Sequence, residues 1–427
     1  GWLNSIFSQL PGMRGADSAP RGLSLLLHLL IVGVAFSLWP VSHGMAQAKG
    51  AYETALEHAL ATMYAIDYDR AAQQFEEAIR LEPNNPRAYL YLATSYWMKT
   101  LYTQNSLLTT AFGMPPDPYS PSPVTAFPPE LRSQFDAAIR RMKEKAGALV
   151  AAQPNNAAGH FWMGMAEGSE SVFIASVDKK YLAAKGPADR SFDGMEKAVK
   201  LDPNFKDPYF SMGMHMHLLG TRGFFTRMLL KMMGYRVSKE EGRQYVELAM
   251  REGRYVSDDA RLGLLLCHIR EQNWKQALST AGQILQKFPQ DSLLALVIGR
   301  IQSALGEHQE AAATFRLIAT RIQVKHPGYE VMSPGEIRLR LALALLGAGQ
   351  PNEAVAEAEQ ATQDAQAIPL VRAAAHLTLG QARDLLKNRA GAVAAYQATL
   401  GLSPATPSHD KARQFLNHPY DGKVPPG

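Results

Sequence analysis

Length, composition and charge exclude several classes of protein. At 427 residues with 46% hydrophobic content, the chain exceeds one ordinary globular domain and can bury a large core. Its net charge of +5 comes from Lys and Arg residues scattered along the sequence, which disfavours a nucleic-acid-binding surface. The single cysteine, Cys267, excludes an intrachain disulfide and a CxxC metal site.

The N-terminal region has the features of an export signal. Arg14 and Arg21 precede the apolar stretch 23–39, Pro40 ends it, and the small-residue motif 44–46 follows. This order predicts a secretory signal peptide over residues 1–46, and therefore a location in the bacterial periplasm. The alternative is an anchor in the inner membrane, because the 17 residues from 23 to 39 reach the lower limit for spanning a bilayer.

Residues 51–153 predict two helical hairpins. The first covers 51–85, and the second begins with a helix at 86–100, where Pro86 suits a first helical position. Residues 113–130 hold seven prolines, so they cannot be helical. We expect them to form a loop outside the helical stack that can be shortened with little loss of stability, because the cost of loop length grows only logarithmically.

Residues 157–254 predict two further hairpins with insertions. The third carries about four extra helical turns, and the fourth is interrupted by the apolar segment 220–235. On a helix, Arg227 and Lys231 share one narrow face of this segment, and apolar side chains cover most of the rest. We expect the segment to pack under neighbouring repeats. Contact with a membrane surface is the alternative.

The C-terminal half shows a fixed period. Leu264 aligns with Ile298 and Ala277 with Ala311, each pair 34 positions apart. Within this period an apolar helix, a polar turn and a second apolar helix follow one another. We expect Gly299 to lie where the two helices of its hairpin meet. Two more hairpins follow with variable linkers, and residues 408–417 predict a short capping helix.

A helical hairpin repeated every 34 residues resembles the tetratricopeptide repeat (TPR) family, and the resemblance covers about residues 51–405. It implies an all-α fold, a right-handed superhelical solenoid of about eight stacked helical hairpins. The expected organisation is N-terminal units with long insertions over 47–254, C-terminal units with the capping helix over 255–417, and a flexible tail over 418–427.

The resemblance also implies a binding surface. In the TPR family the first helices of the hairpins line an inner groove that holds a protein or peptide segment. Carried over by position, the candidate groove residues are Leu90, Thr94, Trp97, Phe161, Met165, Phe210, Met214, His217, Arg300, Leu377 and Gln381.

No sequence motif points to catalysis. We find no nucleophile elbow, phosphate-binding loop, zinc signature or paired-carboxylate motif. His215 and His217 are two positions apart, so they do not face each other on a helix. We therefore expect no enzymatic activity, no metal and no cofactor.

The function that these features favour is a non-catalytic interaction scaffold of the cell envelope, with a protein or peptide partner and no nucleic acid. Two alternatives stay open. One is a membrane-associated assembly factor that uses the leader and residues 220–235 as contacts. The other is a ligand-binding component serving a transporter, with the third and fourth hairpins walling a pocket. Fold alone does not decide between them.

Overall fold

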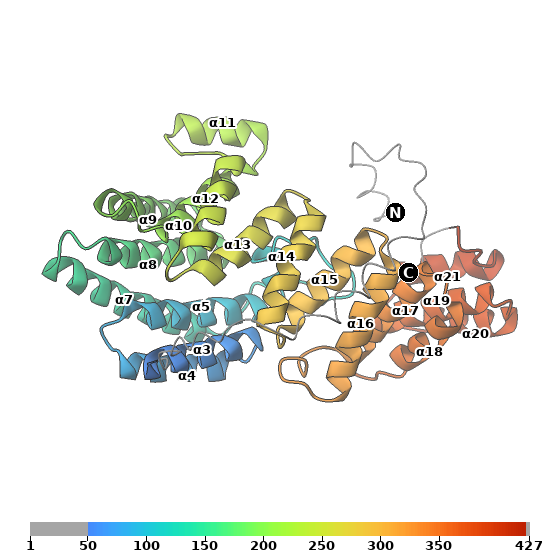
Figure 1. Ribbon diagram of the computed structural model, residues 1–427. Coiled ribbons are helices and arrows are strands. Elements are labelled where there is room, and N and C mark those ends of the chain that lie inside the picture. The colour runs from blue at the N-terminus through green and yellow to red at the C-terminus, as the bar shows by residue number, and fades with distance from the viewer. Residues whose placement is uncertain (1–49, 424–427) are drawn as a thin grey trace, which may run out of the picture. The chain divides into compact units, whose positions relative to one another are not determined.

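The computed structural model describes residues 50–423, and all regular secondary structure in that range is helical (Figure 1). Residues from Ala51 onward form one compact unit. The helices are α3 (Ala51–Tyr64), α4 (Tyr68–Leu81), α5 (Pro86–Thr103), α6 (Leu107–Thr110), α7 (Pro129–Ala152), α8 (Ala157–Ser176), α9 (Tyr181–Leu201), α10 (Pro208–Gly220), α11 (Phe224–Met232), α12 (Lys239–Glu252), α13 (Ser257–Arg270), α14 (Trp274–Lys287), α15 (Ser292–Ala304), α16 (His308–Gln323), α17 (Pro334–Gly347), α18 (Pro351–Thr362), α19 (Pro369–Leu385), α20 (Arg389–Leu400) and α21 (Pro407–Asn417).

Sixteen of the described helices form eight consecutive hairpins. The pairs are α3–α4, α5–α7, α8–α9, α10–α12, α13–α14, α15–α16, α17–α18 and α19–α20. The two helices of each pair pack together, and the second helix of a pair packs on the first helix of the next. Helix α21 packs on α19 and α20 and closes the stack. The predicted solenoid of about eight hairpins is confirmed, and no strand occurs among residues 50–423.

Close packing between the helices of one hairpin explains the position of Gly299. A Cβ atom on Gly299 would lie 2.6 Å from a ring carbon of Phe315, so the helix accepts this ring only because glycine has no side chain. Gly380 and Tyr396 repeat the arrangement in the last hairpin, with a 2.3 Å approach. Gly299 therefore lies at the expected contact, and the side chain nearest to it is that of Phe315 in the same hairpin.

The backbone conformation of the turn within a hairpin also repeats every 34 residues. Gln272 and Gly306, 34 positions apart, both adopt positive φ, at 57° and 74°, and each directly follows the end of a first helix. A residue in this left-handed region satisfies the last carbonyls of a helix and redirects the chain. The backbone of the turn is thus repeated even where the residue is not glycine.

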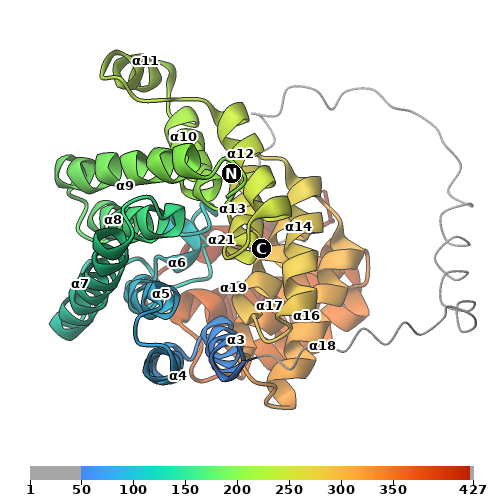
Figure 2. The ribbon, with the colours of Figure 1, turned by 60° about the vertical axis from the view of Figure 1, so that its left-hand side comes forward.

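Hairpins that are far apart in the sequence also touch. The ring of Tyr64, at the end of α3, stacks on Phe288 with centroids 4.0 Å apart. Gln290 Nε2 donates to the carbonyl oxygen of Ala61 over 2.9 Å. Figure 2 shows α3 beside the helices of the fifth and sixth hairpins. The first hairpin is therefore in contact with more than its sequence neighbour.

The two ends of the chain differ in what the structure describes. The predicted signal peptide over 1–46, including the apolar stretch 23–39, lies outside the described residues. Among residues 50–423, none of the helices is both long and apolar enough to cross a bilayer. At the other end, the tail that we expected to be flexible from residue 418 is packed as far as Tyr420. The Tyr420 side chain is buried beside Phe415. The backbone N–H of Tyr420 donates to the Asp384 carboxylate over 2.9 Å.

Candidate functional site

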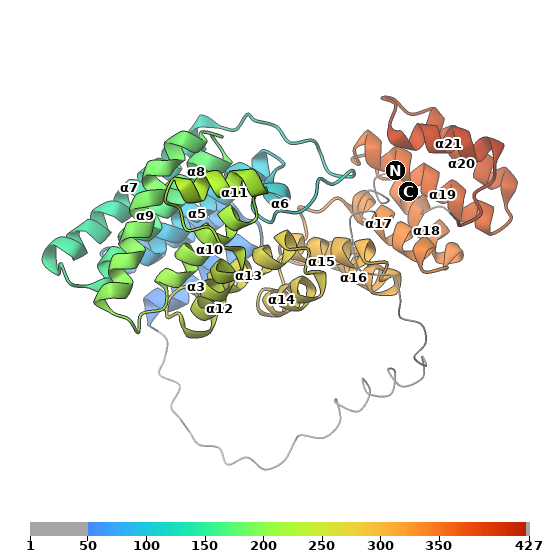
Figure 3. The ribbon, with the colours of Figure 1, turned by 90° about the horizontal axis from the view of Figure 1, so that it is seen from above.

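The first part of the proline-rich segment, residues 112–119, is packed on the protein, so our expectation of a loop outside the stack is wrong for these residues, whereas residues 121–126 are exposed. The segment leaves α6 and runs as an extended chain toward α17 (Figure 3). Phe112 and Met114 are buried in the core cluster of α13, α14 and α15. Tyr119 packs on the cluster formed by α17 and α19. The segment therefore crosses first helices of the last four hairpins, which is the surface that the family resemblance marks as the groove.

Two arginines on successive first helices hold the centre of this segment. Arg300 on α15 donates from Nη2 to the carbonyl oxygen of Pro115 over 2.8 Å, and its Nε lies 3.4 Å from the Asp117 carboxylate. Arg340 on α17 donates from Nη2 to the same carboxylate over 2.5 Å. The Arg340 guanidinium also lies 5.3 Å from the centre of the Tyr119 ring. One carboxylate thus bridges two repeats.

The charges at this contact are shielded from water. The Asp117 side chain is 5% exposed and that of Arg340 is 7% exposed. Burial by itself raises the pKa of Asp117, but Arg340 and Arg300 outweigh burial and hold the pKa below its ordinary value. Glu336 accepts a second bond from Arg340 over 2.9 Å, and burial raises the pKa of Glu336. A buried ion pair of this kind is costly to break, because each charge left alone is poorly solvated.

One donor of the site is not used by the segment. Among the described residues, Arg300 Nη1 is buried and has no hydrogen-bond partner. Arginine carries five N–H donors in a planar fork that suits carboxylates. The site therefore has the capacity to bind one more acceptor than Pro115 and Asp117 supply.

The structure separates the predicted groove residues into three groups. Arg300 contacts the segment, as described above. Four are half-buried, and three of these pack against other helices; for example, Trp97 Nε1 donates to Ser176 Oγ over 2.9 Å. The fourth, Thr94, donates from Oγ1 to Leu90 of its own helix. The half-buried residues are Thr94, Trp97, Phe210 and Met214. The remaining six are buried in the core and present no surface to a partner in this structure: Leu90, Phe161, Met165, His217, Leu377 and Gln381. A partner-binding role for these residues stays a prediction.

The sequence reasoning missed Asp117, Arg340 and Arg270. Arg270 lies against the backbone of the segment at Gly113. The sequence did contain an indication that Arg340 has a buried partner, because Arg340 is the one charged residue in the otherwise apolar run 339–346. A charged residue on a face that must be buried needs a partner. Its partner Asp117 lies in a segment too distant along the chain to be paired with it by pattern alone.

Helix α11 does not pack under neighbouring repeats, which corrects the preferred expectation for residues 220–235. None of its residues is buried. Only Arg227 and Leu230 are half-buried within the helix, and all its other side chains are exposed. The alternative that we left open, contact with a membrane surface, is not tested by this geometry.

Other groups with possible chemistry are confined to the core. His217 is buried and its Nδ1 lies 3.0 Å from the carbonyl oxygen of Lys239. Burial raises the pKa of the Cys267 thiol to about 12, so the thiolate that acts as a nucleophile is not populated near neutral pH. Within residues 50–423 no group of three or more His, Cys, Asp or Glu side chains is placed to hold a metal ion.

The fold and the site together define a helical-hairpin repeat protein whose first helices hold an extended segment. The sequence profile of the tetratricopeptide repeat family matches residues 56–104, 268–323 and 339–407. These matches fall on the first, second and fifth to eighth hairpins. The chain is a member of the tetratricopeptide repeat family, and its repeats are of the kind that serves as a protein-interaction scaffold.

Solved structures with similar folds share little sequence with this chain. A thermophilic TPR protein of Thermus thermophilus, TTC0263, is 16% identical, covers 60% of this chain and 99% of its own, and has a TM-score of 0.31. Yeast Tom70 is 12% identical over 86% of this chain and 88% of its own, with a TM-score of 0.31. No curated protein matches the sequence significantly. These similarities identify neither a partner nor an activity for this chain.

Proposed function

We propose that this protein is a non-catalytic scaffold of the cell envelope that binds an extended protein segment on α13, α15 and α17. The partner segment carries a carboxylate that Arg300 and Arg340 recognise. The observation that supports this proposal is Asp117, which occupies that position from within the same chain. The chain's own segment thus supports a ligand with an acidic side chain.

The properties of segment 113–119 indicate what such a partner needs. Three of its seven residues are prolines, which favour an extended conformation with little entropy left to lose on binding. Prolines also lack N–H donors, so the segment presents mainly acceptors to the arginines. A partner with similar prolines and an acidic residue fits, and the free Nη1 of Arg300 favours one with a second acceptor nearby.

Because the surface is occupied, a partner must displace the resident segment. The apparent affinity is then lower than the intrinsic affinity by the fraction of molecules in which the surface is free. A variant without the resident segment therefore binds more tightly than the natural chain. This difference separates specific binding at the surface from adhesion elsewhere on the molecule.

The test is peptide binding measured by fluorescence anisotropy. In one variant, residues 113–121 are replaced by a Gly-Ser linker of equal length, which leaves the chain connected. A labelled peptide with the sequence of residues 113–121 is expected to bind this variant, and to bind the natural chain far more weakly. The same peptide carrying Asp117→Asn should lose about tenfold or more, since hydrogen bonds to charged groups contribute about 1.5–3 kcal/mol.

Arg340→Gln in the linker variant provides the matched control. It should weaken binding of the acidic peptide and leave the weak binding of the Asn peptide unchanged. The proposal fails if the linker variant, shown to be folded by circular dichroism, binds neither peptide or binds both equally well.

We also propose that the protein is exported to the periplasm by residues 1–46. The apolar stretch 23–39 and the small-residue motif at 44–46 support this proposal. N-terminal sequencing of protein from its natural host should then begin at Gln47. A start upstream of Leu23 would instead establish a membrane anchor.

A further inference from the structure

Helix α11 exposes its apolar side in a way that a helix of a soluble protein normally avoids. Phe225 is 79% exposed and Met232 is 77% exposed. The other exposed apolar side chains of this surface are Phe224, Met228, Leu229 and Met233. The helix stands apart from the stack beyond α10 and α12 (Figure 1). A surface helix usually turns its apolar stripe to the core, and a contiguous exposed stripe indicates an interaction site.

The charges around α11 are of one sign. Residues 220–239 contain five basic side chains and no acidic one. Two of the five are paired with glutamates, Arg236 with Glu196 of α9 over 3.1 Å and Lys239 with the adjacent Glu240 over 3.5 Å. Among the described ion pairs, none involves the other three, which are Arg222, Arg227 and Lys231. The apolar stripe thus has a positively charged rim.

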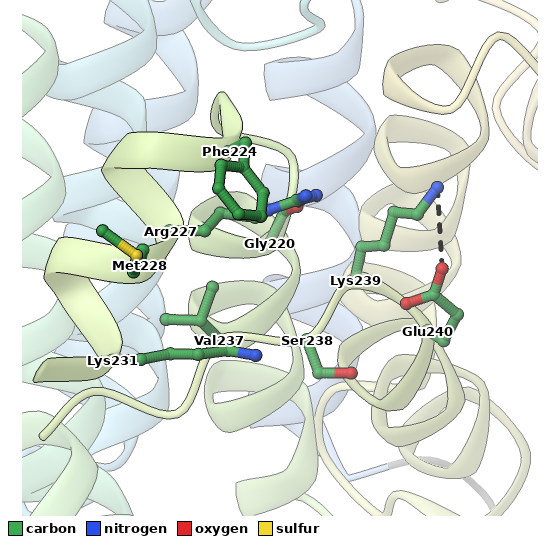
Figure 4. A pocket seen from close by; sticks show the side chains of 9 residues that line it. All are labelled: Gly220, Phe224, Arg227, Met228, Lys231, Val237, Ser238, Lys239 and Glu240. Carbon is green, nitrogen blue, oxygen red and sulfur yellow. Dashed lines mark hydrogen bonds and ion pairs between the residues drawn. The ribbon is translucent and has the colours of Figure 1, made fainter.

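A pocket of about 430 Å³ lies between α11 and the start of α12 (Figure 4). Figure 4 shows the side chains of Arg227, Lys231 and Lys239 around it, together with the apolar side chains of Phe224 and Met228. Glu240 is the one acidic residue that lines the pocket, and it is the partner of Lys239. Basic groups beside an apolar face suit a ligand that joins a phosphate to hydrocarbon.

A neighbouring corner of the fold repeats this character. Leu182, in the first turn of α9, is 91% exposed, and Tyr181 beside it is also exposed. Three lysines lie between positions 179 and 185, of which Lys185 is paired with Asp189 and the other two are in no described ion pair. Lys185 Nζ lies 5.1 Å from the ring centre of Tyr235, which follows α11. The basic and apolar surface therefore continues from α11 onto the start of α9.

We propose that α11 docks on an anionic phospholipid surface. The apolar stripe enters the boundary between headgroups and acyl chains, and Arg227 and Lys231 meet lipid phosphates. Interfacial helices bind through buried apolar area together with attraction to anionic lipid, and each basic residue near such a surface contributes to that attraction. The docking is independent of peptide binding at Arg300 and Arg340.

Charge complementarity favours a lipid surface over the other possible occupants. A second copy of the chain would bring the same basic rim against itself. The apolar stretch 23–39 of this chain is preceded by Arg14 and Arg21 against the single acid Asp17, so it too lacks the opposite charge. Only an occupant that is both apolar and anionic complements the surface.

The test places an environment-sensitive dye on α11 of the full chain through Leu229→Cys. Cys267 is buried and its thiol pKa is raised to about 12, so labelling is confined to the new residue. With vesicles of phosphatidylcholine and phosphatidylglycerol, the dye emission should shift to the blue. With phosphatidylcholine alone it should stay unchanged. Arg227→Gln and Lys231→Gln should each lower the partition coefficient about fivefold.

Gly282→Cys provides the matched control, because Gly282 is exposed on α14 and nothing lies within 4 Å of its side-chain position. Dye at that site should not respond to either vesicle. The dye reports only on its own surroundings. Binding of residues 23–39 to a vesicle therefore does not by itself shift the emission of dye at position 229. The proposal is overturned if dye at position 229 ignores anionic vesicles, or if it responds equally to both vesicle types. It is also overturned if the emission is already shifted without lipid, since a second copy or another segment then covers α11.

Discussion

At the scale of single residues, Gly299 is the position where a missing side chain is essential. A Cβ atom there would meet the Phe315 ring at 2.6 Å. Gly299→Leu should lower the free energy of unfolding by about 1–3 kcal/mol, because overpacked cores shift side chains and backbone. Urea unfolding measures this change.

Gly282→Leu is the control for that variant. Gly282 lies in the middle of α14 with nothing within 4 Å of its side-chain position, and glycine inside a helix costs about 0.5–1 kcal/mol relative to alanine. This variant should be neutral or slightly stabilised. Gly347, at the end of α17, is unsuitable as a control because a Cβ there would lie 2.5 Å from the His308 ring. Equal losses at 299 and 282 would contradict the assigned packing.

Asp291 should make stability depend on pH. Its carboxylate caps α15 by accepting the N–H of Leu294 over 2.9 Å, and burial raises its pKa from 3.8 to about 7. The folded protein then holds this proton more tightly than the unfolded chain, so the contribution of Asp291 to stability falls as pH rises through that window. Asn keeps the cap without titrating.

Asp291→Asn should therefore gain stability relative to the natural chain between about pH 5 and about pH 8. Urea unfolding at both values measures the difference. A difference that does not change with pH would show that the pKa of Asp291 is ordinary in the folded protein.

At the scale of elements, the sequence predicted secondary structure better than it predicted packing. The prolines correctly excluded a helix from residues 113–128, although α7 begins at Pro129, two residues before the predicted end of the loop. The segment 220–235 does contain the helix α11. The local pattern of apolar and polar residues did not predict which other elements each helix or loop packs against. Asp117 finds its partners on α15 and α17, which only the curvature of the repeats brings near. The apolar stripe of α11 is visible in the sequence, but the pattern does not state whether it faces core or solvent.

The packed state of residues 112–119 predicts resistance to proteolysis there. Asp117→Asn removes the charge that Arg340 and Arg300 hold, so the segment should open about tenfold to a hundredfold more often. Chymotrypsin cleavage at Phe112 and Tyr119 should become faster in proportion. Asp410→Asn removes one partner of an exposed pair with Arg413 and should change nothing, since such pairs contribute little. Equal cleavage of the natural chain and the Asp117 variant would show that the segment is not held by its charge.

At the scale of the whole molecule, the repeats are coupled beyond nearest neighbours. A simple solenoid transmits a disturbance to adjacent repeats only, which would insulate residues 51–100 from changes in the sixth hairpin. The stacking of Tyr64 on Phe288 and the bond from Gln290 to Ala61 contradict that insulation. Residues 112–119 add a second link, from the second hairpin to the last four.

Tyr64→Ala tests this coupling. It should destabilise the protein by at least about 1 kcal/mol through the lost ring pair, and hydrogen exchange should become faster over residues 284–292 although they are distant in sequence. Tyr181→Ala, at an exposed ring, should leave both quantities unchanged. Faster exchange confined to the first two hairpins would mean that the contact between α3 and Phe288 does not form in solution.

Hydrogen exchange of α15 and α17 tests most directly whether the inner surface is a peptide-binding site occupied by the chain's own segment. The natural chain is compared with the variant that carries a Gly-Ser linker at residues 113–121, before and after the free peptide is added. We predict that the linker variant loses protection around Arg300 and Arg340, that the peptide restores it, and that the Asp117→Asn peptide does not. Unchanged protection in the linker variant, or equal recovery with both peptides, would contradict the account.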